Sequence, residues 1–220
     1  MRSFIISLVL LGVNLTACTD NKPVTASTET PTAVVQDDRG ASDGILYTAD
    51  IQTSIVRWKG TEPVGNGHYG SLRLKSGSLR LDESGRLLGG EFVLDMDGIA
   101  VEDLSGSKKN KLESHLKDGD FFETNKYPEA RFRMTDATPA DQNGAVKITG
   151  DLTMRDATHP VRFPATLRLD GARLEAETPE FEIDRTKWGV TYRSGLIGTL
   201  KDNLIDDAIK LQIRLQATKQ

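Results

Sequence analysis

The sequence predicts an all-β fold built from about eight antiparallel strands. Apolar and polar residues alternate with a period of two in successive segments, glycine-containing turn signals separate these segments, and most connections are short. Alternation of this kind gives a strand one dry face and one wet face. A two-sheet sandwich and a closed barrel both bury such dry faces, and periodicity alone does not choose between them.

The N-terminal residues 1–17 have the features of an export signal. Arg2 is followed by the apolar run FIISLVLLGV, which is about half the length that a membrane-spanning helix needs. Leu15, Thr16 and Ala17 then lead into the only cysteine of the chain, in a pattern that resembles the lipobox of bacterial lipoproteins. We therefore expect cleavage after residue 17 and acylation of the cysteine, which would anchor the protein to a membrane.

Residues 18–44 are expected to form the acylated cysteine and a flexible tether. The stretch after Cys18 is rich in Thr, Ser, Ala, Pro and Asp and shows no apolar periodicity. Thr19, rather than an aspartate, follows the cysteine. By resemblance to sorted bacterial lipoproteins, this favours the periplasmic face of the outer membrane. The folded domain is then expected over residues 45–220.

The alternating segments define the expected strands of this domain. The alternation of apolar and polar residues shifts by one position at Gly77, which suggests a β-bulge there. Pro128 has no backbone N–H, so the strand that carries Phe132 and Met134 is expected to begin at or just after it. The residues expected on the dry faces are Leu72, Leu74, Leu79, Leu81, Phe92, Leu94, Met96, Phe132, Met134, Val146, Ile148, Gly150, Leu152, Met154, Val161, Phe163, Ala165, Leu167, Leu169, Phe181, Ile183, Ile209, Leu211, Ile213 and Leu215.

One short helix is expected, over residues 108–117. Leu112 and Leu116 are four residues apart and therefore share a face, and Ser107 is placed to cap the start of the helix.

Composition and motifs argue against several function classes. The net charge is −4 and the pI about 5.5, so there is no basic excess to neutralise phosphates and no nucleic-acid partner is expected. A lone cysteine leaves no intramolecular disulfide. His68, His115 and His159 form no pair with metal-ligand spacing, and we interpret them as surface or turn residues. No metal, no cofactor and no enzymatic activity are expected.

A cluster of carboxylates leaves a hydrolase as the alternative enzyme class. A glycosidase-like pair needs only proximity in space, which sequence spacing does not test. The carboxylates concerned are Asp95, Asp97, Glu102, Asp103, Asp118 and Asp120.

Four stretches resemble the YceI-like family over roughly residues 45–217. The segment LESHLKDGDFFETNKYPEARF carries a leucine-rich turn, then D-F-F, then Y-P and a strand. The segments GGEFVLDMDGIAVEDL and ITGDLTMRDATHPVRFP resemble the family's strand before the helix and its hairpin, and FEIDRTKWGV with DNLIDDAIKLQIRL resembles its C-terminal part. The stretches W-K-G and H-Y-G-S-L make this chain most similar to a divergent branch.

The resemblance implies an extended, lipocalin-like, eight-stranded antiparallel barrel with one short helical insertion. It also implies an exported protein that holds a long polyisoprenoid or similar amphiphile inside the barrel. Such a ligand needs no catalytic group, because each buried methylene contributes about 0.8 kcal/mol. A structural envelope protein with a packed barrel is the alternative, and a homodimer is left open.

The barrel interior is therefore the expected ligand site. Phe121 and Phe122 are expected where the helical insertion meets the barrel, either beside a ligand path or as a seal of the core. Arg185 shares a side with Ile183, where it would meet a polar head group or pair with Asp184 or Asp207, and we favour the pairing. The candidate ligand-binding residues are Phe92, Leu94, Met96, Phe121, Phe122, Phe132, Met134, Ile148, Leu152, Phe163, Leu167, Ile183, Arg185 and Ile213.

Overall fold

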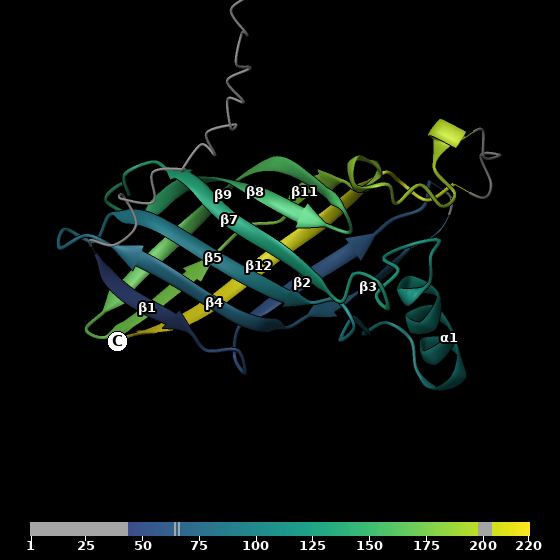
Figure 1. The fold of residues 1–220 in the computed structure, drawn as a ribbon, viewed down its shortest axis with the longest axis horizontal. Helices are drawn as coiled ribbons and strands as arrows, with labels where there is room; N and C mark the ends of the chain where they lie inside the picture. The colour runs from purple at the N-terminus through teal and green to yellow at the C-terminus, as the bar shows by residue number, and fades with distance from the viewer. Residues whose placement is uncertain (1–43, 64, 66, 198–203) are drawn as a thin grey trace, which may run out of the picture. The chain divides into compact units, whose positions relative to one another are not determined.

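The computed structural model describes residues 44–63, 65, 67–197 and 204–220 (Figure 1). The predicted signal segment, Cys18 and residues 19–43 lie outside this range. None of the described helices is both long enough and apolar enough to cross a membrane. The elements are β1 (Ile45–Ala49), β2 (Ile55–Gly60), β3 (His68–Leu72), β4 (Leu74–Leu81), β5 (Leu87–Asp95), β6 (Ala100–Val101), α1 (Gly106–Lys117), β7 (Glu129–Ala137), β8 (Ala145–Met154), β9 (Ala157–Asp170), β10 (Arg173–Glu177), β11 (Phe181–Asp184), the 3-10 turns η2 (Arg185–Trp188) and η3 (Gly195–Ile197), and β12 (Ala208–Lys219).

The strands form one antiparallel sheet that closes on itself. Around the ring the order is β1-β4-β5-β7-β8-β9-β10-β12, and β12 pairs back with β1, where Tyr47 lies opposite Lys219. Closure leaves no free edge in this ring of eight strands. The predicted all-β, eight-stranded antiparallel barrel with one helix is confirmed, and the sandwich is excluded.

Twelve segments make eight strands because four strands of the barrel are interrupted. β1 and β2 both run antiparallel to β12 and are two halves of one strand, as are β3 with β4, β5 with β6 and β10 with β11. Thr178 bridges the last interruption: its N–H donates to the carbonyl of Ile213 at 3.0 Å, and its hydroxyl accepts the N–H of Ile213 at 2.9 Å. Consecutive strands therefore follow one another around the barrel as an up-and-down meander.

The strand containing Gly77 corrects one prediction. The register of β4 against β5 shifts between Leu74 and Ser76, before the glycine, and Gly77 itself pairs regularly with Phe92. An added Cβ at Gly77 would lie 2.5 Å from Cδ1 of Phe92. The glycine therefore makes room for an inward-facing ring, and the bulge belongs to the residues before it.

Helix α1 begins two residues before the predicted start. Its N-cap is Ser105, whose side chain makes no capping hydrogen bond, so the predicted cap at Ser107 is wrong: that residue lies inside the first turn. Strand β7 begins at Glu129, immediately after Pro128 as predicted. α1 lies at the end of the barrel opposite to the C-terminus (Figure 1).

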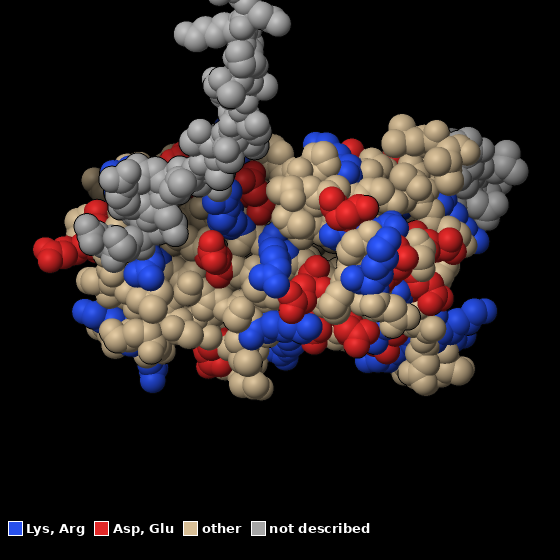
Figure 2. Space-filling view, in the orientation of Figure 1, with Lys and Arg blue, Asp and Glu red and all other residues tan. Residues whose placement is uncertain are grey.

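The outer face of the barrel is solvated and carries mixed charge. Figure 2 shows basic and acidic side chains interspersed along the wall. Arg133 of β7 and Asp151 of β8 form a cross-strand pair at 3.6 Å, and Arg214 of β12 pairs with Glu177 of β10 at 2.8 Å. Leu169, expected on the dry face, is 46% exposed because it lies at the last residues of β9, next to the turn. The inward face of the sheet is where the site must be sought.

Candidate functional site

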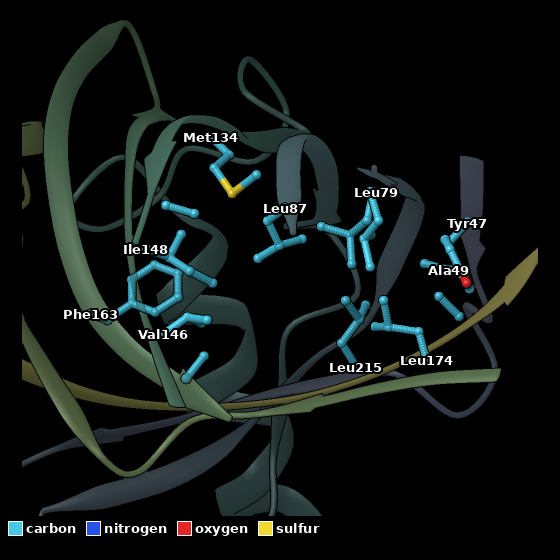
Figure 3. Packing of buried hydrophobic residues seen from close by; sticks show 14 of the residues in the cluster. Tyr47, Ala49, Leu79, Leu87, Met134, Val146, Ile148, Phe163, Leu174 and Leu215 are labelled. Carbon is cyan, nitrogen blue, oxygen red and sulfur yellow. The ribbon is translucent and has the colours of Figure 1, made fainter. Parts of the chain in front are cut away.

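The barrel encloses two apolar cavities, with volumes of about 130 Å³ and about 160 Å³. The first lies within the ring of eight strands, where Met134, Phe163 and Leu79 point from different walls into a common interior (Figure 3). The second is lined by residues of β2, α1 and the turn that follows α1. Cavities of about 150 Å³ with apolar walls stay dry and take up apolar molecules.

The two cavities are neighbouring parts of one interior. Five side chains line both of them, and these come from β2, β5, β8, β11 and β12, so that they form a ring around the barrel. We call this ring the waist; its residues are Val56, Leu94, Leu152, Ile183 and Leu211. Only side chains separate the cavities, and side chains change rotamer far more readily than strands separate.

All fourteen candidate residues line this interior. The period-two alternation of β5, β7, β8, β9 and β12 places there those that lie on these five strands. Whether they touch a ligand stays a prediction. Phe92, Phe132, Met134, Ile148, Phe163, Leu167 and Ile213 line the first cavity, Met96, Phe121, Phe122 and Arg185 line the second, and Leu94, Leu152 and Ile183 line both.

Phe121 and Phe122 lie in the turn that follows α1 and close the second cavity from that side. The N–H of Phe122 donates to the carbonyl of Leu116 at 3.1 Å, which ties the turn to the helix. The ring of Phe121 is 8% exposed and packs 5.0 Å from His115 and 5.2 Å from Tyr192, measured between ring centroids. The two phenylalanines thus join the helical insertion to the barrel, and both face the cavity.

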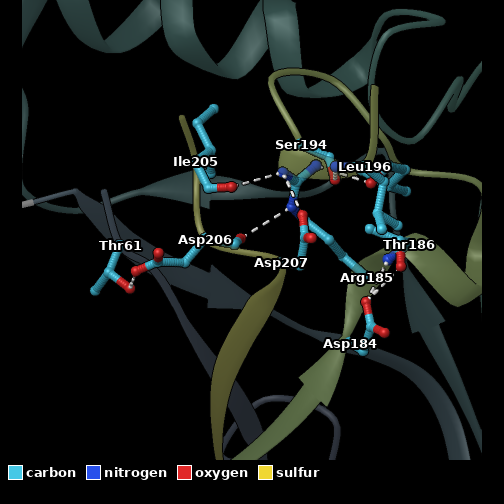
Figure 4. A network of polar contacts seen from close by, with 10 residues as sticks. Thr61, Asp184, Arg185, Thr186, Ser194, Leu196, Ile205, Asp206 and Asp207 are labelled. Carbon is cyan, nitrogen blue, oxygen red and sulfur yellow. Dashed lines mark hydrogen bonds and ion pairs between the residues drawn. The ribbon is translucent and has the colours of Figure 1, made fainter. Parts of the chain in front are cut away.

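Arg185 is buried at the side of the second cavity, where its guanidinium holds the chain that leads into β12 (Figure 4). Nε donates to the carbonyl of Asp206 at 3.1 Å, and Nη1 to the carbonyl of Val190 at 2.8 Å. Nη2 donates to the carbonyl of Ile205 at 3.0 Å and to Oδ1 of Asp207 at 3.3 Å.

Burial lowers the pKa of Arg185 from its ordinary value, while nearby carboxylates, Asp207 first among them, oppose this. The predicted pairing with Asp207 is confirmed. Asp184 instead accepts the N–H of Thr186 at 3.0 Å and starts the η2 turn. Because four of its five N–H groups are engaged within the chain, Arg185 acts as a clamp rather than as a head-group ligand.

Sequence reasoning missed Trp58 of β2 and the part that two histidines take in lining the interior. Trp58 lines the second cavity, and the alternation of Val56, Trp58 and Gly60 was the signal that could have found it. His68 lies in β3 and lines the same cavity, and His115 lies in α1 against Phe121. Both side chains are partly exposed, His68 by 41% and His115 by 34%, so the predicted surface positions hold, but both residues lie in regular elements rather than in turns.

An up-and-down, eight-stranded antiparallel barrel around an apolar interior defines a lipocalin-like barrel protein. A model of the YceI-like domain matches residues 47–217, and the chain belongs to the YceI-like family.

Two relatives known from sequence match part of the chain. It is 35% identical over 104 residues to a UPF0312 protein of Pseudomonas putida (strain GB-1), a stretch that covers 47% of this chain and 46% of that protein. It is 32% identical over 125 residues to a UPF0312 protein of Vibrio parahaemolyticus, covering 53% and 58% of the two chains. The chain spans about half the length of the curated relatives it matches.

Solved structures share the fold at low identity. BcnA of Burkholderia cenocepacia matches with a TM-score of 0.61 at 20% identity, over 77% of this chain and 99% of that one. A polyisoprenoid binding domain from Saccharophagus degradans matches with a TM-score of 0.56 at 14% identity, over 79% and 98%. At these identities the likeness concerns the fold alone.

Proposed function

We propose that the barrel holds a long-chain apolar molecule, an isoprenoid or a similar amphiphilic lipid, and carries or stores it without changing it chemically. The observation that carries this proposal is the apolar interior in two parts, joined at the waist. A chain that passes the waist would bury methylenes against both sets of walls, at about 0.8 kcal/mol each. The ligand named for the Saccharophagus degradans domain supports an isoprenoid as the first class to test.

The carboxylates support a binding function over a hydrolase. They are bonded to separate partners rather than facing each other across a cavity. Glu102 accepts from Ser71 at 2.6 Å, and Asp97 accepts from Thr124 at 3.1 Å. Oδ2 of the exposed Asp120 lies 3.2 Å from Nε2 of His115.

Filling the first cavity tests the proposal. Ala165 and Leu167 both line it from β9, so Ala165→Trp and Leu167→Trp should reduce the lipid that organic solvent extracts from protein purified out of its native envelope. Thermal stability should change little, because a large side chain fills a cavity at less cost than it overpacks a filled core. Native mass spectrometry of the same samples measures the bound lipid, and it also tests whether a homodimer forms.

Arg168→Trp is the matched control, since it adds the same side chain to an exposed position of β9 and should leave lipid content unchanged. A packed barrel predicts the opposite pattern: no lipid in the native protein, and a loss of about 1–3 kcal/mol or more for both cavity variants. That result would replace the carrier with the structural envelope protein.

We further propose that Cys18 is acylated and that residues 19–44 tether the barrel to the periplasmic face of the outer membrane. The lipobox-like residues before Cys18 and Thr19 after it support this. Cys18→Ser should move the protein from the membrane fraction to the soluble fraction, or leave an uncleaved precursor. Identical fractionation of the variant and the parent would contradict the anchor.

A further inference from the structure

One buried polar atom at the second cavity makes no hydrogen bond within the described part of the chain. It is the indole Nε1 of Trp58, which is shielded from solvent. Trp188, the other of the two tryptophans, instead donates its Nε1–H to the carbonyl of Leu152 at 3.0 Å. A buried donor without an acceptor is unfavourable and rare in folded proteins. Trp58 is thus a donor that a cavity ligand is able to satisfy.

The sheet holds the indole of Trp58 on the inner face. Trp58 lies opposite Leu211 of β12 on one side and Gly70 of β3 on the other. An added Cβ at Gly70 would lie 2.8 Å from Cζ2 of Trp58 and 1.8 Å from the carbonyl oxygen of Ala100. Glycine at this position therefore lets the ring lie against the wall, where it lines the cavity without closing it.

His68 is the next inward residue of β3 and lies opposite Gly60. It is therefore a diagonal neighbour of Trp58 on the same face, within reach of aromatic side chains. Its Nδ1 lies 2.7 Å from Oδ2 of Asp103, and Oδ1 of Asp103 accepts the N–H of Tyr69 at 3.2 Å.

Burial alone would raise the pKa of Asp103, but the hydrogen bonds from His68 and Tyr69 bring that pKa below its usual value. An ionised carboxylate only accepts hydrogen bonds, so Nδ1 of His68 carries the proton, and in the neutral imidazole Nε2 is an acceptor. The wall of the second cavity thus offers one donor and one acceptor at diagonal positions of β2 and β3.

We propose that Trp58 and His68 form a head-group subsite for a long apolar chain that ends in a hydroxyl. A hydroxyl oxygen accepts the Nε1–H of Trp58, and the hydroxyl proton is donated to Nε2 of His68. The chain then extends past the waist into the first cavity. This inference rests on the proposed function and adds to it the chemistry of the ligand's polar end and the direction in which the ligand lies.

The charges around the second cavity favour a neutral head group. Glu62 lines the cavity, Asp206 accepts from the hydroxyl of Thr61 at 2.6 Å, and Asp207 pairs with Arg185. Arg185 already donates to three backbone carbonyls and to the carboxylate of Asp207. A phosphate or carboxylate at this end would therefore meet like charges without a free cation among these residues, and like-charge contact is strongly unfavourable.

The two tryptophans allow a direct spectroscopic test. We would label the delipidated protein with ¹⁵N-tryptophan and add geranylgeraniol, geranylgeranyl phosphate or a hydrocarbon of the same chain length. The indole N–H resonance of Trp58 should move downfield with the alcohol and not with the hydrocarbon. The resonance of Trp188 is the internal control and should stay in place, because its proton already has an acceptor.

Affinities measured on Trp58→Phe separate the N–H from the ring. The variant should bind geranylgeraniol about tenfold more weakly, equivalent to about 1.4 kcal/mol, while its affinity for the hydrocarbon changes much less. Loss of ring contact affects both ligands, so only the difference reports the hydrogen bond. His68→Phe, which keeps an aromatic ring but removes the acceptor, should show the same selectivity for the alcohol.

Each contrary result has a distinct meaning. An equal loss for the alcohol and the hydrocarbon, with an unmoved Trp58 resonance, would overturn the subsite and leave the carrier function standing. Tighter binding of geranylgeranyl phosphate than of the alcohol would overturn the neutral head group. Failure of all three probes to bind would instead overturn the proposed function itself.

Discussion

The two ends of the barrel differ in how they are filled. At the end that holds the C-terminus, Leu174 is 0% exposed and packs beside Leu215 (Figure 3). Leu81 is 1% exposed, and neither Leu174 nor Leu81 lines either cavity. At the end that holds α1, the interior contains the second cavity, which Trp58 and His68 line. The two ends of the interior are therefore not equivalent, because the unpaired donor of Trp58 lies at the α1 end.

The connections between strands also differ between the two ends of the barrel. Short turns join β4 to β5 and β9 to β10 at the packed end. At the other end, α1 and its following turn connect β6 to β7, and the η2 and η3 turns lie between β11 and β12. Long connections on a rigid barrel are where binding groups are usually placed. The chain thus has short turns at the end that holds the C-terminus and long connections at the end that holds α1.

The largest expected effect on stability is at the end that holds α1. Arg185→Met should lower the free energy of unfolding by about 3–5 kcal/mol, because it leaves the carboxylate of Asp207 and several buried carbonyls without their donor. Urea unfolding followed by tryptophan fluorescence measures this. Arg214→Met is the control: its pair with Glu177 is exposed, and its loss should cost about 0–1 kcal/mol. Similar small costs for both would show that the clamp does not hold this end together.

A second pair of variants tests whether the other end is the packed one. Leu174→Ala should cost about 2–5 kcal/mol, because it opens a void where side chains are in full contact. Leu211→Ala at the waist should cost about 2 kcal/mol or less, since that side chain already borders a cavity and loses fewer contacts. Calorimetric or urea unfolding compares them, and the reverse order would contradict the assignment of the two ends.

The smallest effect concerns pH. The pKa of Asp103 is lower in the folded protein than in the unfolded chain, so its stabilising contribution is present at neutral pH and is lost as pH falls through the folded-state value. Asp103→Asn should therefore be less stable than the parent at pH 7, and the difference should shrink below about pH 4. Urea unfolding across that range gives the comparison. A difference that is independent of pH would mean that the carboxylate's ionisation contributes nothing.

The barrel and most of its lining could be predicted from the sequence because they depend on alternation alone. Every inward residue of β5, β7, β8 and β9 that was chosen as a site candidate lines the interior. β2 escaped notice because only Val56 and Trp58 mark its dry face before Gly60. A short strand with one aromatic residue and flanking charges gives little periodic signal.

The polar part of the site could not be predicted because pairing in space creates it. His68 and Asp103 are 35 residues apart and meet only because β3 pairs with β6. The orphaned donor of Trp58 likewise depends on Gly70 lying opposite, which is a matter of register. Neither fact can be read from local sequence, so His68 and Trp58 were not identified as site residues.

The pairing of β1 with β12 has a consequence for biosynthesis. It places Tyr47 opposite Lys219, so the ring stays open along one seam until nearly the whole domain has been synthesised. Contacts between segments so far apart in the chain form slowly, since the intervening loop must first be closed. During that interval the interior is reachable from the side, along its full length. A ligand that is too long or too stiff to enter the finished barrel could be enclosed at this stage, as β12 pairs with β1.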